Sequence, residues 1–135
     1  VATVDAAGKV TVKGPGVAKI TVKAAATTDY KAASKTVTVT VAPKKQSISL
    51  VNKIKKQLTI KWKKNTKASG YQVVYSTNKK FTGKKTVRKA KTTTSYKIKG
   101  LKKGKKYYVK VRSYKTVNGK RIYGAYSTVK KATIK

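Results

Sequence analysis

The strongest constraint on the fold is an alternating segment near the C-terminal end of the chain, at residues 106–115. It follows the turn sequence Gly100-Leu-Lys-Lys-Gly104. Because successive side chains of a β-strand point to opposite faces, Tyr107, Val109 and Val111 share one face that can enter a core. The other face presents cations and phenol rings to its surroundings: Tyr108, Lys110, Arg112 and Tyr114.

Similar alternating segments recur through residues 45–135 and are separated by turn signals. Val117–Lys120 carries the Asn-Gly pair of a tight hairpin turn. Phe81 lies in a polar loop, and we expect it to fold back on the sheet edge. Seven short strands in about ninety residues indicate an all-β fold, an antiparallel sandwich. The predicted strands are Ser47–Val51, Gln57–Trp62, Gly70–Tyr75, Lys84–Lys89, Thr94–Ile98, Lys106–Lys115 and Ser127–Ile134.

The motifs of these strands resemble the fibronectin type III family over residues 45–135. Trp62 stands at the position of the family's second-strand tryptophan, and Gly70-Tyr-x-Val-x-Tyr75 matches its third strand. The most diagnostic motif is matched by Leu101-x-x-Gly104-x-x-Tyr107-x-Val109-x-Val111. Tyr123-Gly-Ala-Tyr-Ser127 matches the approach to the last strand. The resemblance implies an Ig-like fibronectin type III β-sandwich.

The same resemblance implies structural roles for the large aromatic residues. Trp62, Tyr71 and Leu101 are expected in the core, and Tyr107 is expected at the tyrosine corner of the sandwich. Lys103 departs from the family, which usually has proline there. Lysines also occupy many outward positions, so we expect the usual fold with an unusual surface.

Residues 1–42 carry a second set of alternating segments and end in a short linker, Ala42-Pro-Lys-Lys45. Turns are expected at Asp5–Gly8 and Gly14–Gly16, and a small polar loop at Ala24–Ser34 holds Asp29 and Tyr30. We predict strands at Val1–Val4, Lys9–Val12, Val17–Val22 and Thr36–Val41, the last of them half-buried.

The spacing of these segments resembles the C-terminal half of a bacterial immunoglobulin-like domain of group 2. The matching patterns are Val-Ala-Thr-Val-Asp-x-x-Gly-Lys-Val at 1–10, Gly-Val-Ala-Lys-Ile-Thr-Val at 16–22, and the Thr-Val repeat that ends at Val41. About forty residues cannot close a two-sheet sandwich. We therefore expect a domain cut short, in a chain that is a fragment of a longer protein; a further chain that completes the sheet is the alternative. The predicted modules are residues 1–42, partial Ig-like, and 43–135, fibronectin type III.

The distribution of charge limits the partners of the chain. Thirty-six Lys and Arg residues face two acids, Asp5 and Asp29, for a net charge of +34. Residues 43–135 hold thirty of the basic residues and neither acid. A folded domain without internal counter-charge repels itself and attracts polyanions. We expect association with nucleic acid, anionic cell-wall polymer, sulfated glycan or acidic lipid; the alternative is a solvated surface without a dedicated ligand.

The residue types that most catalytic and metal sites need are scarce. The sequence has no His, no Cys and no Glu, and its two Asp residues lie in turn or loop positions. General acid–base catalysis uses His, paired carboxylates or a tuned Lys, and Ca²⁺ needs several oxygen ligands. We expect no enzyme activity, metal or cofactor. No apolar run approaches the roughly 20 residues of a membrane span, so we expect no membrane insertion.

The outward face of the 106–115 strand is the candidate polyanion-binding site. Rings between cations can stack on sugars or bases while Lys and Arg hold phosphate or sulfate groups. Lysines on an edge strand also prevent sheet-to-sheet aggregation, so the same residues fit a structural role. Gln72 and Val74 are expected to flank this face. The candidate residues are Tyr108, Lys110, Arg112, Tyr114, Lys84, Lys85, Arg88 and Lys89, with Lys91 continuing the basic edge.

Three functions remain open. The pairing of the two module types resembles exported Gram-positive proteins and implies a non-catalytic extracellular spacer or adhesion module that binds anionic cell-wall polymer. The second function is binding of host or environmental polyanions such as sulfated glycan, mucin or DNA. The third is a carbohydrate-binding accessory to an upstream enzyme. The excess of Lys over Arg favours diffuse charge attraction over reading of bases.

Overall fold

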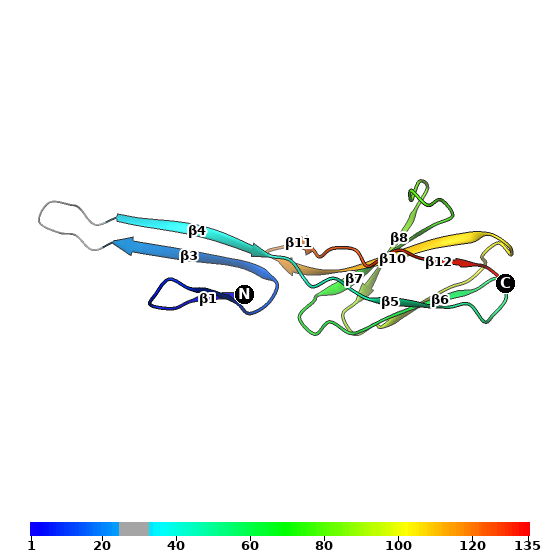
Figure 1. Ribbon diagram of the computed structural model, residues 1–135, viewed down its shortest axis with the longest axis horizontal. Helices are drawn as coiled ribbons and strands as arrows, with labels where there is room; N and C mark the ends of the chain where they lie inside the picture. Colours follow the sequence, from blue (N-terminus) through cyan, green and yellow to red (C-terminus); the bar gives the residue numbers. More distant parts are fainter. Residues whose placement is uncertain (25–32) are drawn as a thin grey trace, which may run out of the picture.

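The structure, a computed structural model, describes residues 1–24 and 33–135, and its regular elements in these ranges are all β-strands. Two hairpins at the N-terminal end lead into a sandwich at the C-terminal end (Figure 1). The loop expected at Ala24–Ser34, with Asp29 and Tyr30, lies almost wholly outside the described residues. The strands are β1 (Ala2–Val4), β2 (Val10–Val12), β3 (Gly16–Ala24), β4 (Ala33–Val41), β5 (Ile48–Val51), β6 (Leu58–Trp62), β7 (Gly70–Ser76), β8 (Lys85–Ala90), β9 (Ser95–Ile98), β10 (Lys106–Val117), β11 (Lys120–Tyr123) and β12 (Lys130–Thr133).

Strands β5 to β12 form two antiparallel sheets that pack as a sandwich. One sheet has the order β5-β6-β9, and the other has the order β11-β10-β7-β8. Strand β10 is long enough to pair with two short strands on one side, β11 along Tyr114–Val117 and β12 along Lys106–Val109. The predicted all-β antiparallel sandwich is confirmed. All seven predicted strands of this part are present, and β11 is one more.

The last part of the sandwich differs from the prediction in detail. The turn between β10 and β11 has positive φ at Asn118 (49°) and Gly119 (75°), which is why an Asn-Gly pair occurs there. The closing strand, predicted at Ser127–Ile134, is shorter, because Ser127 bonds to β10 in a different way. The Ser127 amide donates to the Val111 carbonyl (2.7 Å), and the Ser127 Oγ accepts from the Val111 amide (3.0 Å).

Large apolar side chains from both sheets form one core. Trp62 is 6% exposed and Tyr71 fully buried, and their ring centroids lie 5.4 Å apart. The Trp62 Nε1 donates to the Thr93 carbonyl (3.0 Å), and the Tyr71 hydroxyl accepts from the Asn65 amide (2.6 Å). Tyr107 is half-buried and packs against the same core. The predicted core positions of Trp62 and Tyr71 are therefore confirmed, and the polar atoms of both rings are satisfied.

The described residues of the first module, 1–24 and 33–41, form two antiparallel strand pairs. Strand β1 pairs with β2, and β3 pairs with β4 along its whole length, from Gly16 opposite Val41 to Ala24 opposite Ala33. The strand predicted at Thr36–Val41 is present, but the prediction that it is half-buried is wrong for most of its length. Within this segment, only Val39 and Val41 are half-buried. A two-stranded sheet has no second layer over its apolar face. Valines of both hairpins are exposed for this reason: Val4, Val10, Val12, Val17, Val22 and Val37.

The linker is fixed to the sandwich rather than free. Pro43 is buried against Gly124, where a Cβ would lie 2.5 Å from the Pro43 carbonyl oxygen. The Ser113 Oγ donates to the Lys44 carbonyl (3.3 Å). From the first module, the Lys13 carbonyl accepts from the Lys67 Nζ (2.7 Å). These contacts set how the hairpins meet the sandwich.

Candidate functional site

The predicted residues of β10 point away from the core, as the alternation requires. The register places Lys110 opposite Val74 and Arg112 opposite Gln72 of β7, so these β7 residues flank the face as predicted. Every residue of β7 is buried, on the outer face of the sheet as well as the inner. Side chains of β10 and of nearby loops therefore cover this face. The four β10 residues are themselves half-buried: Tyr108, Lys110, Arg112 and Tyr114.

Two cations of β10 lie between aromatic rings that come from neighbouring loops and from the end of β11. The Lys110 Nζ is 4.2 Å from the ring centroid of Phe81 and 4.2 Å from that of Tyr126. The Arg112 Cζ is 4.4 Å from the Tyr126 centroid and 3.8 Å from that of Tyr123. We call this row of rings and cations, Phe81, Lys110, Tyr126, Arg112 and Tyr123, the cation–π ladder. Phe81 thus folds back over the outer face of the sheet.

The ladder is a consequence of the missing acids. Residues 43–135 have no carboxylate side chain, so a half-buried cation there has no acidic partner within its own module. The face of an aromatic ring carries partial negative charge and can take that place. Gln72 adds a carbonyl oxygen, since its Oε1 accepts from the Arg112 Nε (2.6 Å) and from the Tyr126 hydroxyl (3.2 Å). Cations of the chain itself therefore occupy faces of aromatic rings, which are then not free to stack on a ligand.

Tyr114 is also part of the packed surface. Its ring meets Tyr123 edge to face at 5.9 Å, and the Arg121 Cζ lies 5.6 Å from its centroid. Its hydroxyl lies over Gly70, where a Cβ would be only 2.6 Å from that oxygen. Gly70 is therefore required for the position of Tyr114, and the ring has little freedom to stack on a ligand.

Tyr108 is the member of the predicted set that lies in an open hollow. This hollow of about 350 Å³ is lined by Tyr108, Lys79, Val129 and Lys131. Among the described residues, no cation lies over the Tyr108 ring. Lys131 is there because it pairs with Tyr108 across β10 and β12. The sequence did not single out Lys79 or Lys131, because their approach depends on this register and on the loop after β7.

The basic edge at β8 divides between two sides of the strand. Lys85 and Lys89 pair with Tyr75 and Tyr71, whose side chains point inward, whereas Arg88 pairs with Gln72 on the outer face. The Lys89 Nζ lies 4.2 Å over the Tyr96 ring. Inward-pointing lysines on an edge strand are a known protection against edge-to-edge pairing. The predicted basic residues thus divide: Arg88 lies on the outer face with Arg112, whereas Lys85 and Lys89 lie on the other face. The side chains of Lys84, Lys85, Arg88 and Lys91 are exposed.

The pKa of Lys110 reflects the burial and the like charges on this face. Burial lowers the pKa of Lys110 below its ordinary value, and the nearby charges of Lys84 and Arg112 lower it further. The ionised form is therefore less favoured in the folded chain than in the unfolded chain. Because the unfolded chain binds this proton more tightly, the free energy of unfolding should rise as the pH rises through the Lys110 pKa.

A pair of arginine variants tests whether the ladder stabilises the fold. Arg112→Ala removes two cation–π contacts and a charged hydrogen bond, and we expect it to lower the free energy of unfolding by about 1–3 kcal/mol. Arg88→Ala removes the same charge from an exposed site on β8, the edge strand of the same sheet, and we expect a change within about 0.5 kcal/mol. Urea denaturation followed by circular dichroism measures both. Equal effects would show that the ladder contributes nothing.

We also searched the described residues for metal ligands, for an unusual role of Asp5 and for a membrane-spanning helix. Within 1–24 and 33–135, no three His, Cys, Asp or Glu residues come together as metal ligands would. The Asp5 Oδ1 accepts from the backbone amides of Ala7 (3.0 Å) and Lys9 (2.8 Å), which is the ordinary role of Asp at a turn. Over the same ranges, no helix has the length and hydropathy of a membrane span.

Comparisons with known proteins bear on the sandwich. The family model for the fibronectin type III domain matches residues 41–129. No curated protein sequence matches the chain. One similar solved structure is the sixth fibronectin type III domain of human fibronectin type III domain containing protein 3, with a TM-score of 0.57 and 16% identity, covering 71% of this chain and 88% of that one. A structure described as a myokine has a TM-score of 0.54 and 15% sequence identity, and the match covers 69% of this chain and 98% of that one. A computer-based redesign of a β-sandwich protein has a TM-score of 0.56 and 14% sequence identity, and the match covers 67% of this chain and 93% of that one.

Proposed function

Because the chain belongs to the fibronectin type III family through residues 41–129, we propose that it is a spacer and adhesion module that associates with anionic polymer. Domains of this family are typically non-catalytic scaffold modules and are commonly extracellular. The finer proposal is a bacterial cell-surface or secreted protein that binds an anionic cell-wall polymer through lysines. The resemblance of residues 1–42 to half of a bacterial Ig-like domain supports that origin and stays a prediction.

One observation carries the proposal: the sandwich module holds thirty basic residues and no acidic side chain. The ring contacts described above engage only Lys89, Lys110, Arg112 and Arg121. Other lysines are exposed on the β5-β6-β9 sheet and on the loops, among them Lys61, Lys97, Lys99, Lys102 and Lys103. These cations have no acidic neighbour in the module, so a polymer that brings negative charge releases counterions and lowers their mutual repulsion.

The Tyr108 hollow supports a second candidate, a contribution from carbohydrate recognition. A tyrosine ring with an open face can stack on a sugar ring, and Lys79 and Lys131 at the same hollow can hold a sulfate or phosphate group. This arrangement suits a sulfated glycan of a host or of the environment. It also suits a carbohydrate-binding accessory to an enzyme.

Binding to isolated Gram-positive cell walls tests the proposal. The intact chain should bind walls that carry teichoic acid and should lose most of that binding when the acid is chemically removed, because the attraction is to the charge. Tyr108→Ala should change wall binding by less than about threefold if diffuse charge dominates. Equal binding to stripped walls would contradict the proposal. Binding to a neutral polysaccharide that Tyr108→Ala abolishes would instead support the carbohydrate-binding accessory.

A further inference from the structure

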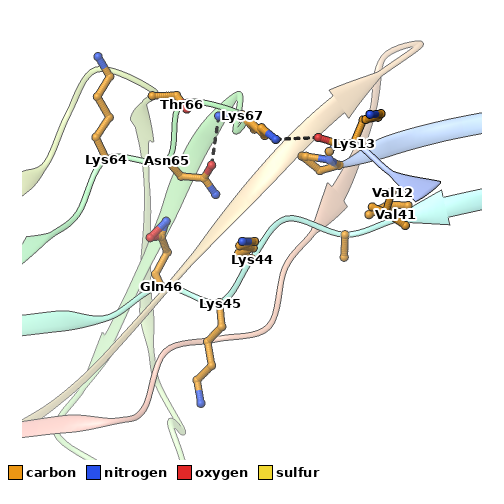
Figure 2. A pocket seen from close by; sticks show the side chains of 13 residues that line it. Val12, Lys13, Val41, Lys44, Lys45, Gln46, Lys64, Asn65, Thr66 and Lys67 are labelled. Carbon is orange, nitrogen blue, oxygen red and sulfur yellow. Dashed lines mark hydrogen bonds between the residues drawn. The ribbon is translucent and has the colours of Figure 1, made fainter. Parts of the chain in front are cut away.

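A groove of about 450 Å³ lies where the linker passes between the hairpins and the sandwich (Figure 2). Three segments form its walls: the end of β2 with the turn that follows, the linker, and the loop after β6. Each segment contributes lysine, and the five lysines that line the groove are Lys13, Lys44, Lys45, Lys64 and Lys67. The groove has no acidic residue in its lining. Lysines from three separate parts of the chain thus line one hollow.

The geometry of the lysines leaves several ammonium groups available to a ligand. The Lys67 Nζ is held by the Lys13 carbonyl (2.7 Å), which fixes its position and leaves it two further N–H donors. Figure 2 shows Lys44 in the middle of the groove, whereas Lys64 and Lys45 extend away from it in opposite directions, so these two side chains must rotate to bring their ammonium groups to a ligand there. All of these side chains are exposed. Within a screening length of about 8 Å such ammonium groups repel one another unless an anion lies between them.

Gln46 is a second and independent sign of a ligand. The residue is only 6% exposed, and its side-chain amide makes no hydrogen bond to the described part of the chain. Figure 2 shows that amide pointing into the groove, toward Asn65. Among the described residues, the only fully enclosed side-chain polar atom without a partner is the Asn52 Oδ1, so the Gln46 amide reaches solvent at the groove and can bond a ligand there. The neighbouring Asn65 amide is already engaged, because its Oδ1 accepts from the Lys67 amide (3.1 Å) and its Nδ2 reaches the Ser113 Oγ (3.5 Å). The Gln46 amide is therefore a directional group of the groove that is free to bond a ligand.

We infer that this groove is a binding site for one tetrahedral oxyanion, a phosphate or sulfate group, which Lys44, Lys64, Lys67 and the Gln46 amide hold. A tetrahedral anion accepts several hydrogen bonds from different directions, as donors from three segments require. The inference deepens the proposed function, because a phosphodiester or sulfate ester of a polymer can supply the group. It does not depend on a polymer, since free phosphate has the same chemistry.

The site also has a mechanical consequence. Lys67 belongs to the sandwich and is tied to Lys13 of the first module, so an anion on Lys67, Lys44 and Lys64 lies across the junction. A bound anion then braces the hairpins against the sandwich. Occupancy should reduce their relative motion, which small-angle scattering and NMR relaxation of the intact chain can measure.

The test is an NMR titration of the intact chain with inorganic phosphate and then inorganic sulfate, at constant ionic strength maintained with chloride. We expect saturable shifts of the backbone amides near Lys44–Gln46 and Lys64–Lys67. The double variant Lys44→Gln/Lys64→Gln should weaken the affinity roughly five- to tenfold, as expected for two exposed charge contacts. Gln46→Ala, which keeps every charge, should also weaken it. Urea denaturation checks that these variants remain folded.

Lys84→Gln/Lys85→Gln is the matched control, because it removes the same two charges near β8, away from the groove. It should leave the affinity within about twofold of the original value. Equal weakening by the control, or shifts that stay linear and spread over all lysines, would show a diffuse counterion atmosphere only and would overturn the inference.

A second arm separates the sources of the anion. Inorganic polyphosphate that saturates the groove more tightly than free phosphate identifies a polymer-borne group, whereas equal affinity per phosphate identifies the free ion. Absence of groove-specific shifts with both probes overturns the site. Wall binding by the intact chain, together with no groove shifts when phosphate or sulfate is added, would leave the proposed function standing while this inference fails. Saturable phosphate binding without wall binding would show the reverse.

Discussion

Binding of the intact chain to an anionic polymer should weaken about 10³- to 10⁵-fold between 50 and 200 mM salt if six to ten anionic groups are neutralised. The expectation follows from the absence of acids in residues 43–135, where no internal carboxylate competes for the exposed lysines. Each contact made by such a lysine releases a condensed counterion, and raising the salt concentration makes that release less favourable. The effect should be similar for polymers of different chemistry that have the same charge density.

Duplex DNA is a suitable first probe, because its counterion release per neutralised phosphate is known. The slope of log affinity against log salt concentration then counts the phosphates engaged, and the same titration with teichoic acid tests the polymer of the proposed function. Tyr108→Ala serves as the control, since it removes a ring and no charge, so the slope should be unchanged. Affinity that is constant up to half-molar salt would exclude binding by charge.

Trp62→Ala should lower the free energy of unfolding by about 3–5 kcal/mol, which is a large part of the stability of a small domain. Trp62 lies in the core between the two sheets, and its ring packs against that of Tyr71 in a tilted arrangement, with the centroids 5.4 Å apart. Its removal leaves a cavity and deprives the Thr93 carbonyl of the Nε1 donor. The sandwich should then unfold at a much lower urea concentration, and its ordered lysine surface should be lost with it.

Circular dichroism follows this unfolding, since the variant lacks the fluorescent indole. Lys61→Ala is the control, because Lys61 is the neighbour of Trp62 on β6 and points to the opposite, exposed face. Its effect should stay within about 0.5 kcal/mol. A loss of less than about 1 kcal/mol for Trp62→Ala would mean that Trp62 does not belong to the cooperative core.

The same alternation rule that located the strands failed for β4. The Thr-Val repeat at Thr36–Val41 has the pattern of a strand with one buried face, and the strand forms, but most of it is exposed. Alternation reports which residues share a face. It does not report whether another layer covers that face, and β3 and β4 form a sheet of only two strands.

The candidate site was predictable in its orientation and not in its contacts. The outward direction of Lys110 and Arg112 follows from their spacing on β10. Their ring partners do not follow from spacing, because Phe81 and Tyr126 come from loops that the fold brings together on one face. The sequence did not predict Gln46 and Lys67 as site residues for the same reason, because the groove forms only where the linker meets the sandwich.

The order of residues by itself determined the sandwich, its aromatic core and a charge that no acid in the module offsets, because alternation, turn residues and composition are local properties. Only the tertiary structure decided which cations are free to meet a partner. That choice depends on strand register and on loops that cross the sheet, which bring a cation beside an aromatic ring at one position and leave it in solvent at another.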